Sequence, residues 1–216
     1  MSALFLLFLL FLFMLIGVPV AVSLGLSSIT TILMFGNQSL TSLAQKFFHT
    51  MQVYPLLAIP FFILAGTFLT TGGVARRMID FANAIVGHFR GGLALAALLA
   101  SAFFAAVSGS APATVVAVGS VMMVGMIRSG YSKEFSAGLI CNAGTLGILI
   151  PPSIVMVVYG AITETSIGKL FMAGVVPGVL LTAMMMITIG VIANKQDLPR
   201  QPRADFAKVW STFREA

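Results

Sequence analysis

Charged residues are scarce in this chain: they make up 8% of its 216 residues, whereas hydrophobic residues make up 59% and the mean hydropathy is +1.06. A soluble domain carries about 25% charged residues, so this composition excludes a soluble domain. Several apolar runs reach the roughly 20 residues that a helix needs to cross the hydrocarbon core, whereas a membrane β-barrel would show segments of about 10 residues with alternating polarity. We therefore expect an all-α integral membrane protein.

Cysteine is nearly absent as well. Cys141 is the one cysteine and lies within an apolar run, which excludes an intramolecular disulfide and a zinc motif. The net charge is +6, but the basic residues flank apolar segments rather than line one face, so we expect no nucleic-acid binding. The apolar stretch from Met1 to Ile16 has no basic residues before it and no small-residue cleavage site after it, which predicts a retained first span rather than a signal peptide.

Apolar and amphipathic segments alternate along the chain. The first apolar block, residues 3–35, is long for one span and short for two, and Gly17-Val18-Pro19 offers a kink. Apolar side chains recur at helical spacing in residues 36–54, in residues 73–90 and in the tail, which predicts three helices at the membrane surface. The predicted divisions are scaffold spans with an interfacial helix (1–72), an amphipathic interfacial helix (73–90), a hairpin (91–127), a broken helix with a following span (133–194) and a basic tail (195–216).

The positions of the basic residues predict the orientation. If both ends of residues 91–127 are cytoplasmic, ten of the twelve basic residues lie inside, and Lys46 and Lys169 lie outside. This distribution obeys the positive-inside rule. It places the tail in the cytoplasm and requires residues 91–127 to enter and leave the membrane on the same side.

The uncharged run between Arg90 and Arg128 is interrupted once, by Ser108-Gly109-Ser110-Ala111-Pro112. Non-helical backbone survives at membrane depth only against protein or a water-filled cavity, so a break there suggests a binding site. The arms of 17 and 15 residues would be about 25 and 22 Å long, short of a crossing of about 30 Å. We favour a re-entrant hairpin; the alternative is two short spans joined by an external turn.

A second break, Asn142 to Ser153, contains two glycines and Pro151-Pro152. The prolines remove two helical N–H donors and the glycines permit unwinding, while Asn142 and Thr145 add side-chain oxygens. Alone, this pattern favours a kinked helix whose polar groups bond to neighbouring helices. Two oxygen-rich breaks in successive segments instead favour a shared site.

No acidic residue lies in either break, which disfavours a proton relay. Carbonyl, hydroxyl and amide oxygens can replace the water of a sodium ion, and the start of the second arm, near Ala113, would present backbone N–H groups to a carboxylate. The residues therefore predict sodium-coupled uptake of an organic anion. A serine nucleophile at Ser108 or Ser110 would need a histidine partner, and no span contains one, so an intramembrane enzyme is disfavoured.

Four motifs resemble one family. They are Gly17-Val18-Pro19-Val20-Ala21, Arg90-Gly91-Gly92-Leu93, Ser108-Gly109-Ser110-Ala111-x-Ala113-Thr114 and Gly144-x-x-Gly147-x-x-x-Pro151-Pro152-Ser153. In this order, through nearly the whole chain, they are similar to the large membrane subunit, DctM type, of TRAP (tripartite ATP-independent periplasmic) transporters. The resemblance implies an elevator-type, ion-transporter-like fold of two inverted repeats, each with a re-entrant hairpin facing a broken helix.

The resemblance also implies site residues. Carried onto this chain, the sodium ligands would be Ser108, Gly109, Ser110, Asn142, Thr145 and Gly147. Substrate contacts are expected at Ser110, Ala111, Pro112 and Pro151. No catalytic residue, no other metal and no cofactor is expected beyond Na+ as the coupling ion.

The implied partners are a small four-helix membrane subunit, a periplasmic substrate-binding protein and the lipid bilayer, in a multi-pass protein of the bacterial inner membrane. The implied substrates are carboxylates such as C4-dicarboxylates or sialic acid. The chain departs from the family in length, because it shows no second hairpin motif and resembles the first repeat, the N-terminal half, alone. Three interpretations of the chain remain open: a fragment, a split gene product that pairs with a separate second-repeat chain, and a remnant. The alternative function is a non-transporting membrane scaffold or assembly fragment.

Overall fold

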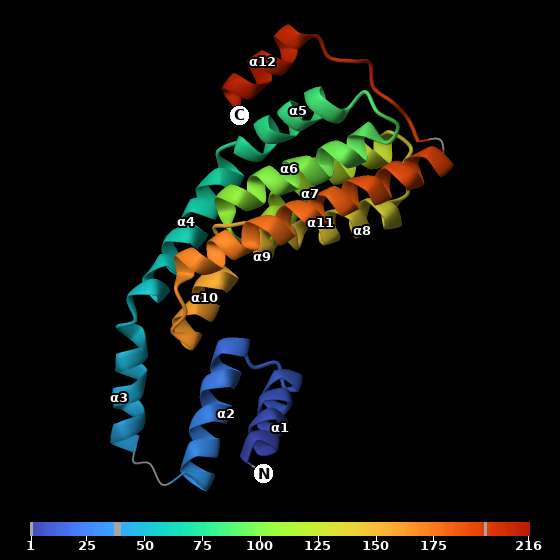
Figure 1. Cartoon of the computed structure of the whole chain (residues 1–216). Helices are drawn as coiled ribbons and strands as arrows, with labels where there is room; N and C mark the ends of the chain where they lie inside the picture. The colour runs from blue at the N-terminus through green and yellow to red at the C-terminus, as the bar shows by residue number, and fades with distance from the viewer. Residues whose placement is uncertain (1, 37–39, 197) are drawn as a thin grey trace. The chain divides into compact units, whose positions relative to one another are not determined.

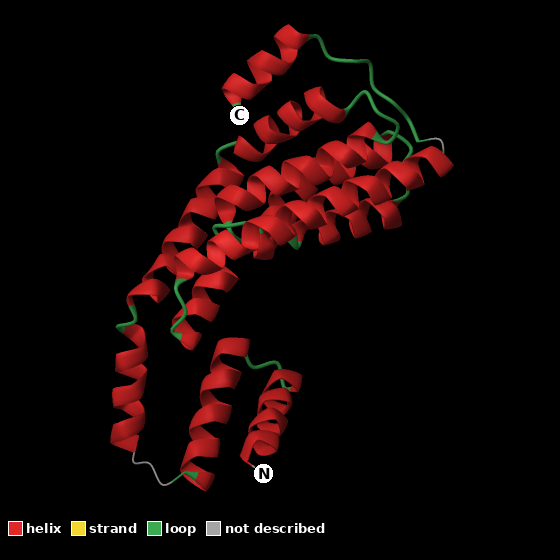
Figure 2. Ribbon diagram, viewed as in Figure 1, coloured by secondary structure: helices red, strands yellow, loops and turns green. Residues whose placement is uncertain are grey.

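The computed structural model describes residues 2–36, 40–196 and 198–216, without the side chains of Leu40 and Leu43. The secondary structure in these ranges is entirely helical, as Figure 2 shows. This confirms the predicted all-α class. The chain forms two compact units, Met1–Val53 and Tyr54–Ala216.

The first unit contains α1 (Ser2–Leu15), α2 (Val20–Phe35) and α3 (Leu40–Met51). The long apolar block is thus two helices that pack side by side, with the rings of Phe5 and Phe35 5.1 Å apart. The chain breaks between them because Gly17 adopts a φ of +87° and Pro19 has no N–H to donate. Each helix is shorter than the roughly 20 residues of a full span.

The second unit holds the remaining helices (Figure 1). In chain order they are the 3-10 turn η1 (Tyr54–Leu57), α4 (Ala58–Thr71), α5 (Val74–Val86), α6 (Gly92–Ser108), α7 (Ala111–Arg128), α8 (Lys133–Gly144), α9 (Leu146–Leu149), α10 (Ile154–Thr163), α11 (Ile167–Lys195) and α12 (Phe206–Glu215). Helices α6, α7, α8 and α11 run alongside one another as a bundle. The predicted helix in the tail is confirmed as α12.

Helix α6 lies at the centre of this unit. It packs against α4, α5, α7, α8, α9 and α11, and most of its residues are buried. Its sequence is rich in alanine, and small side chains let neighbouring backbones approach closely where the solvent is lipid. Phe104 and Leu98 are fully buried and fill the spaces between the helices. The first arm of the predicted hairpin is therefore covered by protein rather than by lipid.

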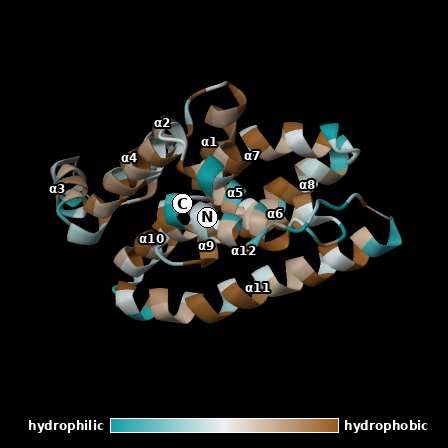
Figure 3. Ribbon diagram, turned by 90° about the horizontal axis from the view of Figure 1, so that it is seen from above, coloured by the Kyte–Doolittle hydropathy of each residue, from teal (hydrophilic) through white to brown (hydrophobic). Residues whose placement is uncertain are grey.

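Several helices are apolar and long enough to cross a bilayer. They are Tyr54–Thr71, α7 and α11, together with the broken pair Lys133–Leu149 and Ile154–Thr163, which is bent by 41°. Helix α11 exposes large apolar side chains along its length, and Figure 3 shows hydrophilic residues near its ends. A large exposed apolar surface of this kind suits contact with lipid. These features fit an integral membrane protein.

The segment predicted as an amphipathic surface helix is covered on two sides. Ala75, Ile79 and Ala82 of α5 are buried and belong to the core that α5 shares with α6. The ring of Phe81 contacts Phe103 of α6 at 5.7 Å and Phe213 of α12 at 5.4 Å. Helix α5 therefore lies between the bundle and the folded-back tail.

We expect Phe104→Ala to lower the free energy of unfolding by about 3 kcal/mol, because it leaves a cavity in the centre of the unit. The matched control is Phe61→Ala in α4, whose ring is 70% exposed and loses few protein contacts. Thermal or denaturant unfolding in detergent measures both. Equal losses in the two variants would contradict the central position of α6.

Candidate functional site: two broken helices in contact

The first break is shorter than predicted. Helix α6 continues to Ser108 and α7 begins at Ala111, so the non-helical residues are Gly109 and Ser110. Pro112 belongs to the first turn of α7, where a missing N–H costs nothing because the first turn has no helical acceptor for it. The second arm is thus 18 residues long, and arm length does not decide between a re-entrant hairpin and two spans.

Hydroxyl groups organise the tip of this pair of helices. The Ser110 side chain caps α7 by accepting a hydrogen bond from the Ala113 N–H at 3.4 Å. The Thr114 hydroxyl donates to the Ser110 carbonyl at 2.8 Å and lies 3.3 Å from the Ser108 hydroxyl. Ser108 and Thr114 are fully buried. The tip is therefore a fixed turn rather than a loose loop.

The second break is present as predicted. Helix α8 ends at Gly144, the single turn of α9 follows from Leu146 to Leu149, and helical structure resumes at Ile154. Ile150 is extended, and Ser153 occupies the N-cap position of α10. The segment between α9 and α10 contains Pro151 and Pro152, which cannot donate backbone hydrogen bonds.

The two breaks contact each other through their backbones. The carbonyl of Gly109 accepts a hydrogen bond from the N–H of Ile154 at 3.0 Å. A Cβ atom on Gly109 would lie 2.6 Å from the Pro152 carbonyl oxygen, and one on Gly147 would lie 2.8 Å from the Ala111 nitrogen. Only glycine permits such close approach. The structure thus brings together Ser108, Gly109, Ser110 and Gly147 of the predicted sodium ligands.

The other two predicted ligands lie on a different face. The side chains of Asn142 and Thr145 are exposed and line a cavity of about 390 Å³ between α8 and α11. Asn142 Nδ2 donates to the Gly138 carbonyl at 2.8 Å, and the Thr145 hydroxyl donates to the Asn142 carbonyl at 2.7 Å. Their positions in the sequence put Asn142 and Thr145 in the second break. The sequence does not show toward which neighbouring helix their side chains point. Their role as ligands stays a prediction.

The predicted substrate contacts are also dispersed. Pro112 is exposed and Ser110 is half-buried at the tip, whereas Pro151 lines an apolar cavity of about 430 Å³ between α6 and α11. The Ala111 nitrogen lies against Gly147, Pro112 has no N–H, and the N–H of Ala113 is bonded to Ser110. The first turn of α7 therefore has few free donors for a carboxylate in this arrangement, and the substrate residues stay predictions.

Two further residues belong to the contact. Thr114 and Ser153 are fully buried beside the tip, and the sequence reasoning did not count either as a ligand. Both stand in the motifs that carry the family resemblance, Thr114 four residues after Ser110 and Ser153 directly after the two prolines. Two features of the sequence could have identified them. Thr114 carries a hydroxyl one helical turn after a predicted ligand, and Ser153 carries one where the broken helix begins again.

The donor set at the contact is neutral and consists of oxygen. Hydroxyl groups of Ser108, Ser110 and Thr114 lie at this turn, where the Ser110 carbonyl accepts from Thr114 and the Pro152 carbonyl faces Gly109. Helix C-terminal ends carry partial negative charge, and such ends with unwound carbonyls suit a sodium ion. No cluster of three His, Cys, Asp or Glu side chains occurs within residues 2–36, 40–196 and 198–216. The chemistry of the contact thus fits Na+.

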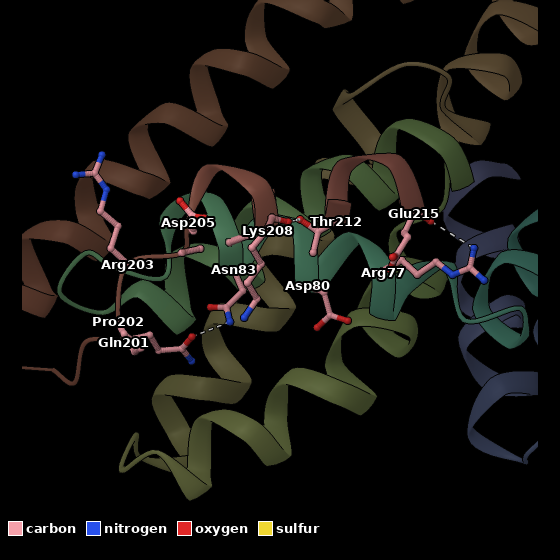
Figure 4. Close-up of a pocket in the computed structure, with 12 residues that line it drawn as sticks. Arg77, Asp80, Asn83, Gln201, Pro202, Arg203, Asp205, Lys208, Thr212 and Glu215 are labelled. Carbon is pink, nitrogen blue, oxygen red and sulfur yellow. Dashed lines mark hydrogen bonds between the residues drawn. The ribbon is translucent and has the colours of Figure 1, made fainter. Parts of the chain in front are cut away.

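A second polar cavity, of about 390 Å³, lies between α5 and the tail (Figure 4). Asn83 Nδ2 donates to Gln201 Oε1 at 2.7 Å, and an Arg77 guanidinium nitrogen donates to the Glu215 carbonyl at 3.3 Å. Cationic and acidic side chains alternate around it and are exposed to solvent. We interpret this cavity as the place where the tail docks on α5, because its charges are balanced and screened by water.

Residues 7–216 match the family described as "Tripartite ATP-independent periplasmic transporter, DctM component". The chain belongs to the DctM family. It is 63% identical over 194 residues to the C4-dicarboxylate TRAP transporter large permease protein DctM of Pseudomonas aeruginosa, covering 90% of this chain and 45% of that protein. This confirms the resemblance that the four motifs indicated.

Other DctM relatives carry different substrate names. The chain is 40% identical to the ectoine TRAP transporter large permease protein TeaC of Halomonas elongata, covering 94% of this chain and 48% of that protein. It is 36% identical to the sialic acid TRAP transporter permease protein SiaT of Haemophilus influenzae, covering 94% of this chain and 33% of that protein. The chain thus spans about half, or less, of the length of these curated relatives.

We expect Gly109→Ala and Gly147→Ala each to lower the free energy of unfolding by about 2 kcal/mol or more, because the new methyl group meets backbone atoms and Gly109 has a φ of +61°. The control is Gly138→Ala, because a Cβ there meets no atom within 4 Å. It should raise the stability of α8 by about 0.5–1 kcal/mol. Thermal unfolding in detergent compares the three, and equal effects would contradict the backbone contact.

Proposed function

We propose that this chain is the first-repeat half of a TRAP-type permease subunit that couples the import of a small carboxylate to sodium. The observation that carries the proposal is the contact between the two breaks, in which Gly109 and Ile154 share a backbone hydrogen bond. Broken helices that meet at membrane depth are a common construction of ion and substrate sites in transporters. Family membership supports the transport class.

Sodium would lie at the contact between the tip and the broken helix. Ser108, Ser110 and Thr114 offer hydroxyl oxygens, and the residues around Gly147 and Pro152 offer carbonyl oxygens. Sodium that moves down its gradient would supply the energy for import. The chain would bind the ion by replacing its water ligands with these oxygens. The positions of Asn142 and Thr145 favour the tip hydroxyls over them as ligands.

The broken helix that the tip contacts supports a position of the tip at membrane depth. The run Lys133–Leu149 and the run Ile154–Thr163 together pass as one bent span. The contact with Gly109 is at the break between those runs, in the interior of that span. If the span crosses the bilayer, the tip ends inside it, which supports the re-entrant hairpin. Helices α6 and α7 would then form the hairpin arms of an elevator-type repeat.

The remaining parts of the proposal rest on the relatives. Substrates would be small carboxylates, because relatives are named for C4-dicarboxylates and sialic acid. Full transport would require a second repeat, a small membrane subunit and a periplasmic substrate-binding protein in the bacterial inner membrane. The positive-inside distribution supports a cytoplasmic location for the tail and α12.

Transport tests the half-transporter proposal. We expect proteoliposomes that contain this chain alone to show no sodium-dependent uptake of radiolabelled succinate, because the chain spans less than half the length of its C4-dicarboxylate relative. Adding a second-repeat chain with the small subunit and binding protein of a C4-dicarboxylate system should restore uptake. Robust uptake by this chain alone, even as an oligomer, would refute the proposal.

Thiol labelling tests the hairpin. In a Cys141→Ser background, which removes the exposed native thiol, Ser110→Cys should react slowly with impermeant reagents from either side, since the tip is half-buried at membrane depth. Ser129→Cys should label from the cytoplasm, and Thr165→Cys from the periplasm. Ready labelling of Ser110→Cys from the periplasm, with none from the cytoplasm in any transport state, would show an external turn instead.

A further inference from the structure

Ser153 carries a buried hydroxyl that the fold does not use. The residue is fully buried, and its Oγ atom has no hydrogen-bond partner among the described residues. It occupies the N-cap position of α10, where a serine ordinarily accepts a hydrogen bond from the helix, yet its side chain makes no capping bond. A buried hydroxyl without a partner is costly, and each one in a native structure requires an explanation.

The position of Ser153 supplies one. A Cβ on Gly109 would lie 3.4 Å from the Ser153 Cα, so Ser153 adjoins the tip of the hairpin. The next residue, Ile154, gives its N–H to Gly109. The hydroxyls of Ser108 and Thr114 are buried in the same turn and lie 3.3 Å from each other. Ser153 thus brings an unshared oxygen to the contact from the broken helix.

Other buried serines differ from Ser153. Ser101 donates to the Ala97 carbonyl at 2.8 Å, and Ser136 donates to the Ser132 carbonyl at 2.9 Å. These bonds satisfy the hydroxyl in the preceding helical turn, which is the common arrangement in membrane helices. At Ser153, two prolines interrupt the helix and the residue is extended. The carbonyl of a preceding helical turn is therefore not in position to accept a hydrogen bond from its hydroxyl. The same break that opens the backbone therefore also leaves this hydroxyl unpaired.

We propose that the Ser153 hydroxyl is a sodium ligand, supplied by the broken helix opposite the hydroxyls of the hairpin tip. The assignment rests on the proposed sodium-coupled function. It adds a hard, neutral oxygen from α10 to a site that otherwise draws its side-chain oxygens from the hairpin. The ligands for the ion then come from both broken helices, so sodium ties the tip to the broken helix.

The test uses the purified full chain, because the hairpin and the broken helix both lie within it. Thermal stability is measured as sodium chloride replaces choline chloride at constant ionic strength. Wild-type stability should rise with sodium. Ser153→Ala should shift the midpoint of that rise to sodium concentrations at least about tenfold higher, since it loses one oxygen ligand to a charged ion.

Two controls separate ligation from structure. In choline alone, Ser153→Ala should be as stable as the wild type or more so, because it removes an unpaired buried hydroxyl. Ser136→Ala should show the opposite pattern, with lower stability in choline and an unchanged sodium midpoint, because its hydroxyl has a backbone partner. Ser153→Cys keeps the side-chain volume but replaces hard oxygen with soft sulfur, so it should weaken the sodium response as Ser153→Ala does.

The outcomes are distinguishable. No sodium response in the wild type would overturn the sodium site and the proposed function with it. A wild-type response with unchanged midpoints in Ser153→Ala and Ser153→Cys would overturn the role of Ser153 alone, and would assign its hydroxyl to a structural water. A stability loss in choline as large as that of Ser136→Ala would also overturn it, because the hydroxyl would then have a structural partner.

Discussion

The rest of the second unit depends on one constraint: two interrupted helices must satisfy each other's backbone groups where water is excluded. The hydrogen bond from the Ile154 N–H to the Gly109 carbonyl meets this requirement directly. Unpaired backbone groups cost several kcal/mol in hydrocarbon, so neither break would be stable facing lipid. Each break therefore requires the other. Gly109 and Gly147 make the contact possible, because a side chain at either position would collide with the opposing backbone.

The surrounding helices support this contact. The hairpin arm α6 is buried among six neighbours, and its alanines allow those neighbours to come close. Helix α4 adds a third wall, since a Cβ on Gly66 would lie 4.0 Å from the Ser108 Cβ and 3.8 Å from the Ala113 Cβ. The tip is thus packed on the sides of α4 and of the broken helix.

The electrostatics of the contact follow from its composition. Neither break contains a carboxylate in its sequence, so the oxygens that the contact offers are those of hydroxyl groups and backbone carbonyls. Neutral oxygens discriminate between ions less by charge than by the number and spacing of contacts, which is compatible with the proposed sodium ion. The proposed ion site draws only on residues of this chain, whereas the chain spans 45% of its C4-dicarboxylate relative from Pseudomonas aeruginosa. Ion binding can therefore be tested separately from complete transport.

The sequence alone determined the all-α membrane class, the two breaks and the family, because apolar length, proline, glycine and ordered motifs are local signals. It placed the second break and the tail helix correctly, and it overestimated the first break because Pro112 can begin a helix as well as end one. Only the tertiary structure decided which oxygens face one another. Asn142 and Thr145 lie in the predicted segment but turn toward α11, whereas Ser153 is buried at the tip. The direction of a side chain beyond a proline break depends on the rotation of the restarted helix, and packing against a distant segment sets that rotation.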